Sequence, residues 1–307
     1  MVARSRRSCL AVPGSSGKML DKAQGLPADQ VFLDLEDAVA PLAKPAARRN
    51  VIAALTTGQW DGKTRVVRIN DATTPWAYRD VLEVVEGAGG SLDCLMLPKV
   101  DAAAQVQWLD LTLTQLERGL GLPVGGIGIE AQIETATGLI NVDQIAAASP
   151  RLETIVFGPA DFMASLQMPS LSVGALHPHY PGDPFHYPLL RILVAARSHH
   201  RQAIDGPYLQ VRDQVGFRQA AQRSAALGFD GKWVLHPDQI AAANEVFTPS
   251  AEDYRRAEQI IEAYDHATSE AGELRGAVML GDEMIDEASR KLALVLAARG
   301  RAAGLSR

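Results

Sequence analysis

The sequence predicts an α/β protein built as a (β/α)8 TIM barrel with a C-terminal helical extension or lid. Eight short apolar segments that resemble buried strands alternate with segments of helical apolar spacing, and this alternation runs from Ser8 to roughly Phe247. Such alternation indicates a parallel sheet covered by helices on both faces, and a closed barrel usually needs about 250 residues. No GxGxxG motif follows the first strand, which disfavours the alternative, a doubly wound open sheet.

Each predicted strand is an apolar run that ends in polar or turn-forming residues. In chain order the eight strands are 8–14 (SCLAVPG), 30–37 (QVFLDLED), 64–70 (TRVVRIN), 93–99 (DCLMLPK), 126–134 (GIGIEAQIE), 153–161 (ETIVFGPAD), 202–207 (QAIDGP) and 232–237 (KWVLHP). The segments between them place apolar residues three and four apart, as in PAARRNVIAAL, AAAQVQWLDLTLTQLERGL and GFRQAAQRSAALG. We therefore expect helices between the strands.

The pattern changes after residue 247, so we expect two domains, a barrel over 1–247 and an extension over 248–307. TPSAEDYRRAEQIIEAYDHATSEAGE begins at a capping signal and predicts a polar-faced helix. LRGAVMLGDEMIDEASRKLALVLAARG predicts a short turn-like piece followed by another helix. Since this tail lies outside the eight units, we expect it to act as a lid, an oligomer arm, or both.

The composition is that of a globular protein and disfavours several classes of partner. No apolar stretch is long enough to cross a bilayer, and a formal charge of −6 argues against nucleic acid as the main partner. Cys9 and Cys94 have neither metal-site spacing nor the number needed for a disulfide framework, which indicates a reducing, cytoplasmic location. The apolar part of the N-terminus is short and broken by Pro13 and Gly14, so it is not a signal peptide.

Charged side chains gather where the predicted strands end, and in a barrel this end forms the active site. In chain order these polar residues are Asp34, Glu36, Asp37, Arg68, Asn70, Lys99, Glu134, Asp161, Asp205, Lys232 and His236. A ring of carboxylates with few cations is hard to maintain without a bound metal. All-oxygen ligation suits Mg²⁺, with Mn²⁺ as the second choice.

Glu134 and Asp161 are the carboxylates that we expect to bind the metal. Each closes an apolar strand and is followed by small residues, TATG and FMAS. For Asp34 and Asp37 we expect a structural role, because acidic residues at strand ends also cap helices or pair with arginine. Glu36 is expected to lie nearest the metal among the three carboxylates of DLED.

Ten motifs, taken in order, resemble those of the HpcH/HpaI aldolase and citrate lyase β-subunit-like family, most closely its malyl-CoA/β-methylmalyl-CoA lyases. The resemblance covers nearly the whole chain. The motifs are VPGS (12–15), LDLEDAVAPLAKPAAR (33–48), VRIN (67–70), MLPKV (96–100), IETATG (133–138), FGPADF (157–162), DGP (205–207), GKWVLHPDQ (231–239), ANEVFTPS (243–250) and MID (284–286).

The resemblance implies an enzyme, a metal-dependent carbon–carbon lyase that cleaves a 3-hydroxyacyl-CoA reversibly into an acyl-CoA and a 2-oxo acid. It also implies a homotrimer or homohexamer. Carried over by motif, Glu134 and Asp161 would bind Mg²⁺ and Arg68 would face the substrate's oxygen atoms. Asp286 of MID would come from a neighbouring subunit's tail and serve as the acid/base, and Glu36 would act beside the metal.

Coenzyme A is part of the implied substrate, and its phosphates predict a basic lip near the first strand. PGSSGK opens a helix there, and backbone N–H groups at a helix start suit a phosphate. We expect contacts from Pro13, Gly14, Ser15, Lys18 and Lys22. Relatives often have PGSR, so Ser16 replaces an arginine and the lysines would substitute as point charges. The alternative is a simple turn followed by solvated lysines.

Two further stretches depart from a plain barrel. The insertion SLSVGALHPHYPGDPFHYPLL carries His177, His179 and His186, but their spacing matches no usual zinc site. We expect this insertion to enclose the acyl portion, with Trp76 and Phe185 as apolar walls. In the tail, Asp282 and Glu283 precede Asp286. Negative charge there would raise the pKa of Asp286, but we expect both side chains to be solvated.

Four functions remain open from the sequence. The leading one is cleavage of L-malyl-CoA or β-methylmalyl-CoA to acetyl-CoA or propionyl-CoA plus glyoxylate. The others are a citramalyl-CoA lyase that releases pyruvate, a CoA-independent HpaI-type aldolase, and a catalytically silent CoA-ester-binding subunit. The tail favours a CoA ester, because an acid on a separate lid suits a bulky substrate. The presence of Glu134, Asp161, Arg68 and Asp286 together favours catalysis, and it favours a metal over a Schiff base on Lys232.

Overall fold

The computed structural model describes residues 4–306 except 175, 177, 178 and 273, so His177 lies outside the described residues. The chain divides into two compact units, Met1–Asn244 and Glu245–Arg307.

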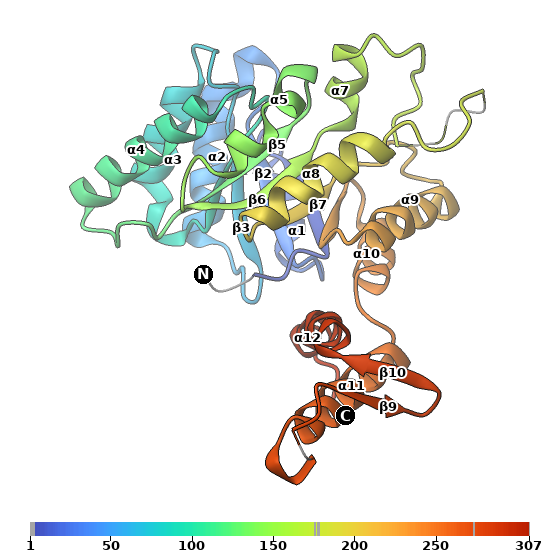
Figure 1. Cartoon of the computed structure of the whole chain (residues 1–307). Helices are drawn as coiled ribbons and strands as arrows, with labels where there is room; N and C mark the ends of the chain where they lie inside the picture. The colour runs from blue at the N-terminus through green and yellow to red at the C-terminus, as the bar shows by residue number, and fades with distance from the viewer. Residues whose placement is uncertain (1–3, 175, 177–178, 273, 307) are drawn as a thin grey trace. The chain divides into compact units, whose positions relative to one another are not determined.

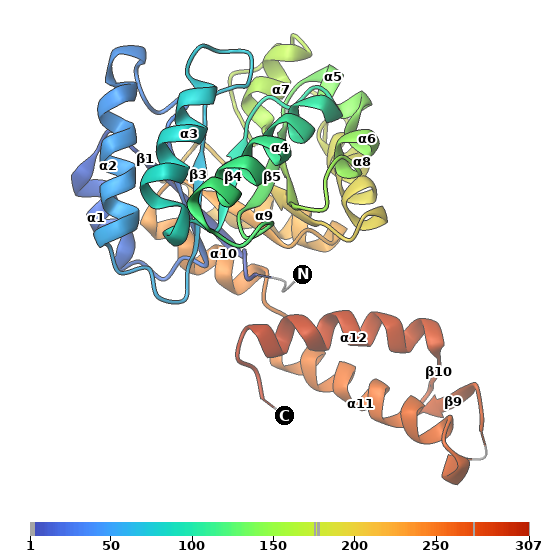
Figure 2. The ribbon, with the colours of Figure 1, turned by 90° about the vertical axis from the view of Figure 1, so that its left-hand side faces the viewer.

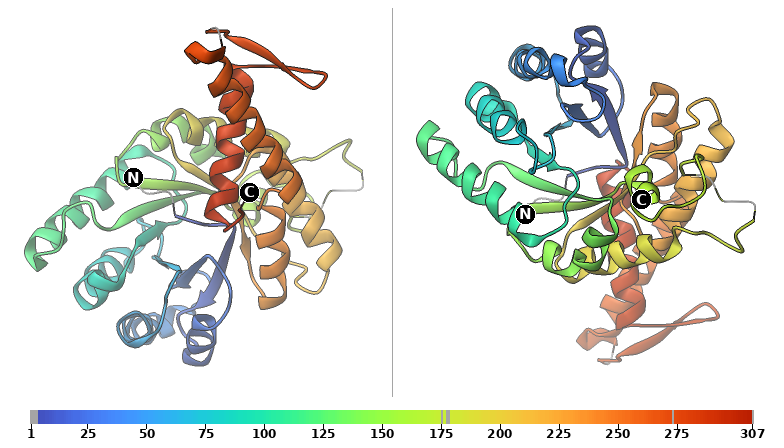
Figure 3. Two further views of the ribbon diagram at one scale, coloured as in Figure 1. Left: turned by 90° about the horizontal axis from the view of Figure 1, so that it is seen from below. Right: turned by 90° about the horizontal axis from the view of Figure 1, so that it is seen from above.

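The first unit is a closed barrel of eight parallel strands in chain order (Figures 1 and 3), which confirms the predicted (β/α)8 fold. The strands are β1 (Ser8–Pro13), β2 (Gln30–Asp34), β3 (Thr64–Arg68), β4 (Cys94–Leu97), β5 (Gly128–Ile133), β6 (Leu152–Phe157), β7 (Gln202–Asp205) and β8 (Gly231–Val234). Pairing of β1 with both β2 and β8 closes the barrel. Every strand ends before its predicted boundary, because the polar residues at its end belong to the following loop or helix.

Helices follow the strands and cover the outside of the barrel; Figure 2 shows α1 to α4 side by side. The helices of this unit are α1 (Gly17–Gln24), α2 (Lys44–Thr57), α3 (Ala77–Ala88), α4 (Ala103–Leu120), α5 (Ala136–Ile140), α6 (Val142–Ala146), α7 (Pro159–Ser165), α8 (His186–Ser198), α9 (Gln214–Leu227) and α10 (Ile240–Val246). Short 3-10 turns are η1 (Pro41–Ala43), η2 (Gly89–Ser91) and η3 (Pro237–Gln239). The helix predicted from PGSSGK is confirmed as α1.

The barrel interior has an apolar middle and polar ends. The middle is one buried cluster, Cys9, Phe32, Val66, Cys94, Met96, Val156, Ile204 and Trp233. Glu130 and Gln132 on β5 and Glu134 directly after it follow one another at every second position and are all buried. Successive strand residues point to opposite faces, so these three share a face. β5 is therefore not the uniformly apolar strand that the sequence analysis assumed.

A buried ion cluster closes the N-terminal end of the barrel. Arg6 is 1% exposed. Its Nε donates to Oε1 of Glu130 at 3.0 Å and to Oε1 of Gln30 at 2.8 Å, and its Nη2 donates to Oε2 of Glu153 at 2.7 Å. Burial raises the pKa of Glu130, while the charge of Arg6 opposes that rise. The cluster tolerates buried carboxylates because each has a cationic partner.

Replacing Arg6 by Met leaves Glu130 buried without its cation. We expect Arg6→Met to lower the free energy of unfolding by about 3–5 kcal/mol. Arg191→Met is the matched control, because Arg191 pairs with Asp143 at the surface and such pairs contribute about 1 kcal/mol or less. Urea titration measures the free energy of unfolding of both variants. Equal losses would show that the buried cluster contributes no more to stability than the ion pair of the control.

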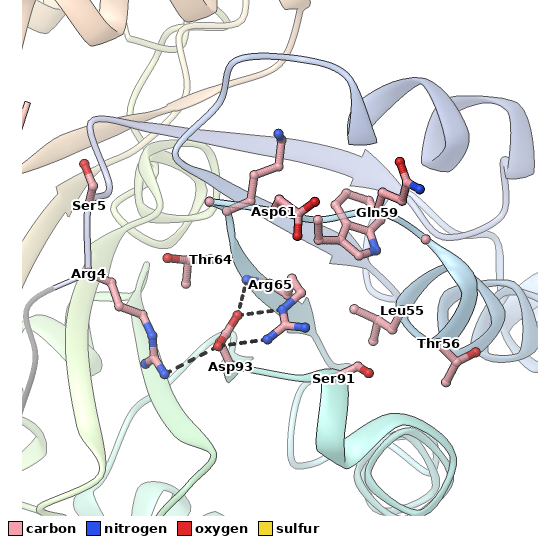
Figure 4. Close-up of a pocket in the computed structure, with 14 residues that line it drawn as sticks. Arg4, Ser5, Leu55, Thr56, Gln59, Asp61, Thr64, Arg65, Ser91 and Asp93 are labelled. Carbon is pink, nitrogen blue, oxygen red and sulfur yellow. Dashed lines mark hydrogen bonds and ion pairs between the residues drawn. The ribbon is translucent and has the colours of Figure 1, made fainter.

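An open hollow of about 620 Å³ lies at the same end of the barrel (Figure 4). Its wall carries Arg4, Lys63, Arg65 and Asp93. Oδ2 of Asp93 accepts from Nε of Arg65 at 2.9 Å, and Oδ1 of Asp93 lies 3.5 Å from Nη2 of Arg4. Both arginines thus have a carboxylate partner within the wall. None of the residues predicted for catalysis or metal binding lines this hollow.

The second unit contains two helices and a β-hairpin. Its elements are α11 (Ala251–Ala267), η4 (Glu270–Gly272), β9 (Ala277–Leu280), β10 (Glu283–Asp286) and α12 (Glu287–Ala302). Ser250 caps α11 by accepting from the backbone N of Asp253 at 3.0 Å, as the capping signal predicts. The predicted turn-like piece is wrong, because β9 and β10 pair antiparallel around Gly281, which has φ +66°.

The helices α11 and α12 pack through one small cluster, Tyr254, Ala257, Ala293 and Ala297. Large apolar side chains remain exposed elsewhere on this unit, namely Met279, Met284, Leu292 and Val295. Within the described part of the chain, no helix combines the length and apolar character needed to cross a membrane.

Candidate functional site

Asp34 and Arg68 form a buried pair at the C-terminal ends of β2 and β3. Nε of Arg68 donates to Oδ1 of Asp34 at 2.7 Å and Nη2 donates to Oδ2 at 2.6 Å. Asp34 also accepts from the backbone N of Glu36 at 2.9 Å and of Ala38 at 3.1 Å. Burial alone would raise the pKa of Asp34, but Arg68 and these backbone donors hold it below its usual value. Asp34 therefore fixes both Arg68 and the DLED loop, which agrees with the structural role expected for it.

Arg68 lies above the apolar middle of the barrel with part of its guanidinium still available. Its Cζ lies 5.3 Å from the ring centroid of Trp233 and 6.0 Å from that of Phe32. Its Nη1 lies 2.9 Å from Oε2 of Glu36. Together with the two bonds to Asp34, this engages three of the five N–H groups of an arginine. The remaining N–H groups can donate to an oxygen atom of a ligand that reaches them.

Glu36 and Lys99 connect this pair to the other carboxylates. Nζ of Lys99 donates to Oε1 of Glu36, lies 3.3 Å from Oδ2 of Asp37 and lies 3.9 Å from Oδ1 of Asp161. Burial raises the pKa of Glu36, and the charges of Arg68 and Lys99 oppose the rise. The side chain of Lys99 thus bridges the β2–α2 loop and α7.

Glu134 follows β5 directly and is 1% exposed. Its Oε1 accepts from the backbone N of Lys99 at 2.8 Å, and its Oε2 accepts from Nε2 of Gln132. Burial, together with the charges of Glu36 and Asp161, raises the pKa of Glu134 to about 8. Gly158 makes room for this carboxylate, because a Cβ at that position would lie 2.3 Å from Oε2 of Glu134.

Asp161 lies in the first turn of α7 and not at the end of a strand. β6 ends at Phe157, and Pro159 occupies the first turn of the helix, where proline's fixed φ is favourable. The strand predicted to reach residue 161 is therefore too long. The Asp161 side chain is 40% exposed, and the N-terminal end of a helix favours its negative charge. Since Asp161 and Glu134 both contact Lys99, the structure brings the two predicted metal ligands to one side of the barrel mouth.

This cluster fits a hard divalent cation. Oε1 of Gln132 is buried and has no hydrogen-bond partner among the described residues. This oxygen lies beside Glu134, whose pKa is raised by burial and by like charges, and both features favour a nearby cation. No group of three or more His, Cys, Asp or Glu in the described residues forms a complete cage. Mg²⁺ commonly takes only one or two carboxylates, at which Glu134 and Asp161 could hold it.

A cavity of about 330 Å³ opens beside Glu36, with Trp76 in its wall. Nζ of Lys44 lies 5.0 Å from the Trp76 ring centroid and donates to the carbonyls of Leu35 and Glu36 at 2.9 and 3.0 Å. Trp76 thus lines this cavity. Phe185 does not line it and is buried, with its ring centroid 5.8 Å from that of Phe157, and the role of both as apolar walls stays a prediction.

The predicted CoA lip lies at the start of α1. Ser16 caps this helix by accepting from the backbone N of Met19 at 3.4 Å. A Cβ on Gly14 would lie 2.8 Å from the carbonyl oxygen of Asp34, so packing against β2 is sufficient reason for glycine there. Pro13 is half-buried, whereas Ser15, Lys18 and Lys22 are exposed. Their contacts with coenzyme A stay a prediction.

Asp286 belongs to the second unit and caps α12. Its Oδ1 accepts from the backbone N of Ser289 at 3.0 Å and of Ala288 at 2.9 Å. These bonds hold the pKa of Asp286 below its usual value, and no rise from Asp282 or Glu283 is seen in the single chain. Asp282 is exposed, and Glu283 is exposed and paired with Arg256 at 2.7 Å.

Lys232 and His236 have structural partners. Nζ of Lys232 donates to Oδ2 of Asp205 at 2.5 Å and to the carbonyl of Gly206 at 2.7 Å. The next residue, Trp233, belongs to the apolar middle of the barrel. Lys232 therefore points away from the interior, which does not suit a Schiff-base nucleophile. His236 caps η3 by accepting from the backbone N of Asp238 at 3.3 Å.

Sequence reasoning missed Gln132, Gly158 and the central position of Lys99. A signal existed for Gln132, because it lies two residues before Glu134 and therefore on the same face of β5. No sequence signal marks Gly158, whose role depends on contact with another strand.

Comparisons with known proteins show the family of the chain. The HpcH/HpaI aldolase/citrate lyase family matches residues 7–237. An L-malyl-CoA/β-methylmalyl-CoA lyase of Cereibacter sphaeroides is 42% identical, covering 96% of this chain and 94% of the relative. A malyl-CoA/β-methylmalyl-CoA/citramalyl-CoA lyase of Chloroflexus aurantiacus is 32% identical, covering 86% and 78%. The crystal structure of CitE from Mycobacterium tuberculosis with magnesium, acetoacetate and coenzyme A has a TM-score of 0.76 at 29% identity, covering 98% of this chain and 100% of that chain.

Proposed function

The chain belongs to the HpcH/HpaI aldolase/citrate lyase family of carbon–carbon lyases, and we propose that it cleaves a 3-hydroxyacyl-CoA with the help of Mg²⁺. The observation that carries this proposal is the geometry at Lys99, which contacts both the buried Glu134 and Asp161, so that two carboxylates meet at the mouth of the barrel. Burial and the charges of Glu36 and Asp161 raise the pKa of Glu134 to about 8, and a nearby cation would favour its ionised form. Magnesium and coenzyme A in the related CitE structure support the same assignment.

The proposed reaction breaks the bond between the hydroxyl-bearing carbon and the α-carbon of the thioester. The hydroxyl group releases its proton to solvent and its carbon becomes the carbonyl of a 2-oxo acid, while the electron pair of the broken bond forms the enolate of the acyl-CoA. A divalent ion at Glu134 and Asp161 would supply Lewis acidity toward the hydroxyl and carboxylate oxygens of the substrate. Arg68 adds fixed positive charge for these oxygens, and Asp34 keeps its guanidinium in place.

A proton must reach the enolate carbon in cleavage and leave the same carbon in synthesis. We assign this transfer to the carboxylate of Asp286. In the single chain the backbone bonds at the start of α12 keep Asp286 ionised, which is the state that a base requires. Placing it in a site with little water would raise its pKa toward a value useful in both directions.

We propose L-malyl-CoA or β-methylmalyl-CoA as substrate, with glyoxylate as the 2-oxo acid product. The name of the Cereibacter relative supports these substrates. The cavity beside Glu36 would take the short acyl portion against Trp76, and Lys18 and Lys22 with the Pro13–Ser15 backbone would meet the CoA phosphates. The Chloroflexus relative also bears citramalyl-CoA in its name, so release of pyruvate from citramalyl-CoA is the second candidate.

Mass spectrometry of the reverse reaction tests the proposal. Purified protein is mixed with Mg²⁺, acetyl-CoA or propionyl-CoA, and glyoxylate or pyruvate. We expect an adduct with glyoxylate that disappears when EDTA is added. A preference for pyruvate would support the citramalyl-CoA candidate. No adduct with any pair, or formation that EDTA leaves unchanged, would overturn the metal-dependent lyase.

We also propose a homotrimer or homohexamer in which Asp286 completes the site of a neighbouring subunit. The exposed Met279, Met284, Leu292 and Val295 of the second unit support burial of this unit in an assembly.

Complementation between two inactive variants tests this sharing. Glu134→Gln and Asp286→Asn are each expected to be inactive alone. Co-expression mixes the two variants at random in one oligomer. If each site takes Glu134 from one subunit and Asp286 from its neighbour, about a quarter of the sites contain both residues intact. We expect that fraction of wild-type activity to return. If both residues act within one chain, the mixture stays inactive.

A further inference from the structure

Lys99 has an unusual backbone conformation that serves Glu134. It lies two residues after β4 and has φ +49°, in the left-handed region that side chains other than glycine rarely adopt. In this conformation its backbone N donates to Oε1 of Glu134 at 2.8 Å. Glycine would adopt the same backbone without strain. The presence of lysine therefore indicates that its side chain has a function of its own.

The side chain of Lys99 reaches three further carboxylates. Its ammonium donates to Glu36 and lies 3.3 Å from Asp37 and 3.9 Å from Asp161. With the backbone bond to Glu134, one residue contacts carboxylates from three parts of the chain: the β2–α2 loop, the end of β5 and the first turn of α7. The contact to Asp161 is the longest, and Asp161 is the more exposed of the two proposed metal ligands.

We propose that Lys99 is a positioning residue that acts as the internal counter-cation of this carboxylate cluster and sets its affinity for the divalent ion. The inference rests on the proposed function, because it takes the cluster to be the ion's site. Without the ion, the ammonium offsets the repulsion among Glu36, Asp37 and Asp161 and keeps them assembled. When an ion binds nearby, the two positive charges repel each other, so Lys99 keeps the affinity lower than the carboxylates alone would give.

Calorimetric titration with Mg²⁺, repeated with Mn²⁺, tests the inference on the full-length protein. Lys99→Met removes the charge and keeps most of the side chain, whereas Lys99→Arg keeps the charge. We expect Lys99→Met to bind the ion about tenfold more tightly than wild type, and Lys99→Arg to stay within about twofold. We expect the melting temperature of Lys99→Met to fall in EDTA and to recover with saturating Mg²⁺. Lys291→Met changes net charge equally at an exposed residue of the second unit and should bind like wild type.

Lys99→Gly separates the side chain from the backbone. Glycine retains the left-handed conformation and the N–H bond to Glu134, so we expect it to bind Mg²⁺ as tightly as Lys99→Met. It also keeps the test available if Lys99→Met does not fold. Unchanged or weaker binding by the uncharged variants would overturn the inference, because a merely structural lysine loosens the site when it is removed. Absence of binding by the wild-type protein itself would instead overturn the proposed function.

Discussion

Glu134→Gln is expected to lower kcat by at least about a thousandfold without loss of the fold. The amide has the size of the carboxylate and can still accept from the backbone N of Lys99. It removes one of two negative groups that would hold the ion, and with it charge stabilisation of several kcal/mol. Because burial and like charges already disfavour the ionised form of Glu134, the variant should be at least as stable as wild type in EDTA. Steady-state kinetics and thermal unfolding measure both effects.

Glu130→Gln is the matched control on the same face of β5. Glu130 is buried like Glu134, but its partner is Arg6 at 3.0 Å. We expect the opposite result, a loss of about 1–3 kcal/mol of stability with kcat nearly unchanged. Activity of Glu134→Gln above about a tenth of wild type would exclude Glu134 from the metal site.

Gly158→Ala gives an independent check on the position of Glu134. Its Cβ would lie 2.3 Å from Oε2 of Glu134, whereas a Cβ on Gly119 in α4 would meet nothing within 4 Å. We therefore expect weaker Mg²⁺ binding from Gly158→Ala and none of that effect from Gly119→Ala.

Arg68→Lys is expected to lower kcat by about a hundred- to a thousandfold, the range for losing one positioned donor group. Lysine keeps the positive charge but cannot pair with both oxygens of Asp34 while still pointing donors at a substrate. The remaining charge beside Asp34 limits the loss of stability, so the effect should appear in kcat more than in the melting temperature. Kinetics with saturating Mg²⁺ separates this loss from weakened metal binding.

Arg65→Lys is the control for this variant, three residues earlier on β3. Arg65 pairs with Asp93 at the other end of the strand, so its replacement should leave kcat within about twofold of wild type, as for a partly exposed ion pair. A near-normal kcat for Arg68→Lys, or an equal loss in Arg65→Lys, would show that the guanidinium of Arg68 has no role in the reaction.

The architecture followed from the sequence because eight apolar runs alternate with helical spacing, and only their ends were misplaced. β6 was predicted to extend to Asp161, although Pro159 begins a helix. A short helix that directly follows a strand gives no separate helical spacing in the sequence. The hairpin at 277–286 was predicted to be a turn-like piece. Gly281 and Asp282 lie in the middle of this short segment, and only the residues before them form an apolar run. The alternation on β5 was visible in the sequence but was obscured by the isoleucines on the opposite face.

The candidate site residues were proposed from residue type and position, and the features that depend on packing were missed. Glu134 and Asp161 were proposed because each closes a predicted apolar strand, where a charge is costly, although Asp161 lies in α7. Arg68 was proposed from the family resemblance. The pairing of Asp34 with Arg68 follows from adjacent strand ends. The backbone of Lys99, the orphaned oxygen of Gln132 and the space at Gly158 arise only when β4, β5 and β6 lie side by side.

The most direct test of the central claim is a crystal structure of the protein grown with Mn²⁺ and glyoxylate or pyruvate, with the ion located by its anomalous signal. We expect one ion at the mouth of the barrel, bound by carboxylate oxygens of Glu134 and Asp161, with the 2-oxo acid between the ion and Arg68. An ion elsewhere, or Glu134 and Asp161 turned apart with no ion between them at saturating Mn²⁺, would contradict the claim.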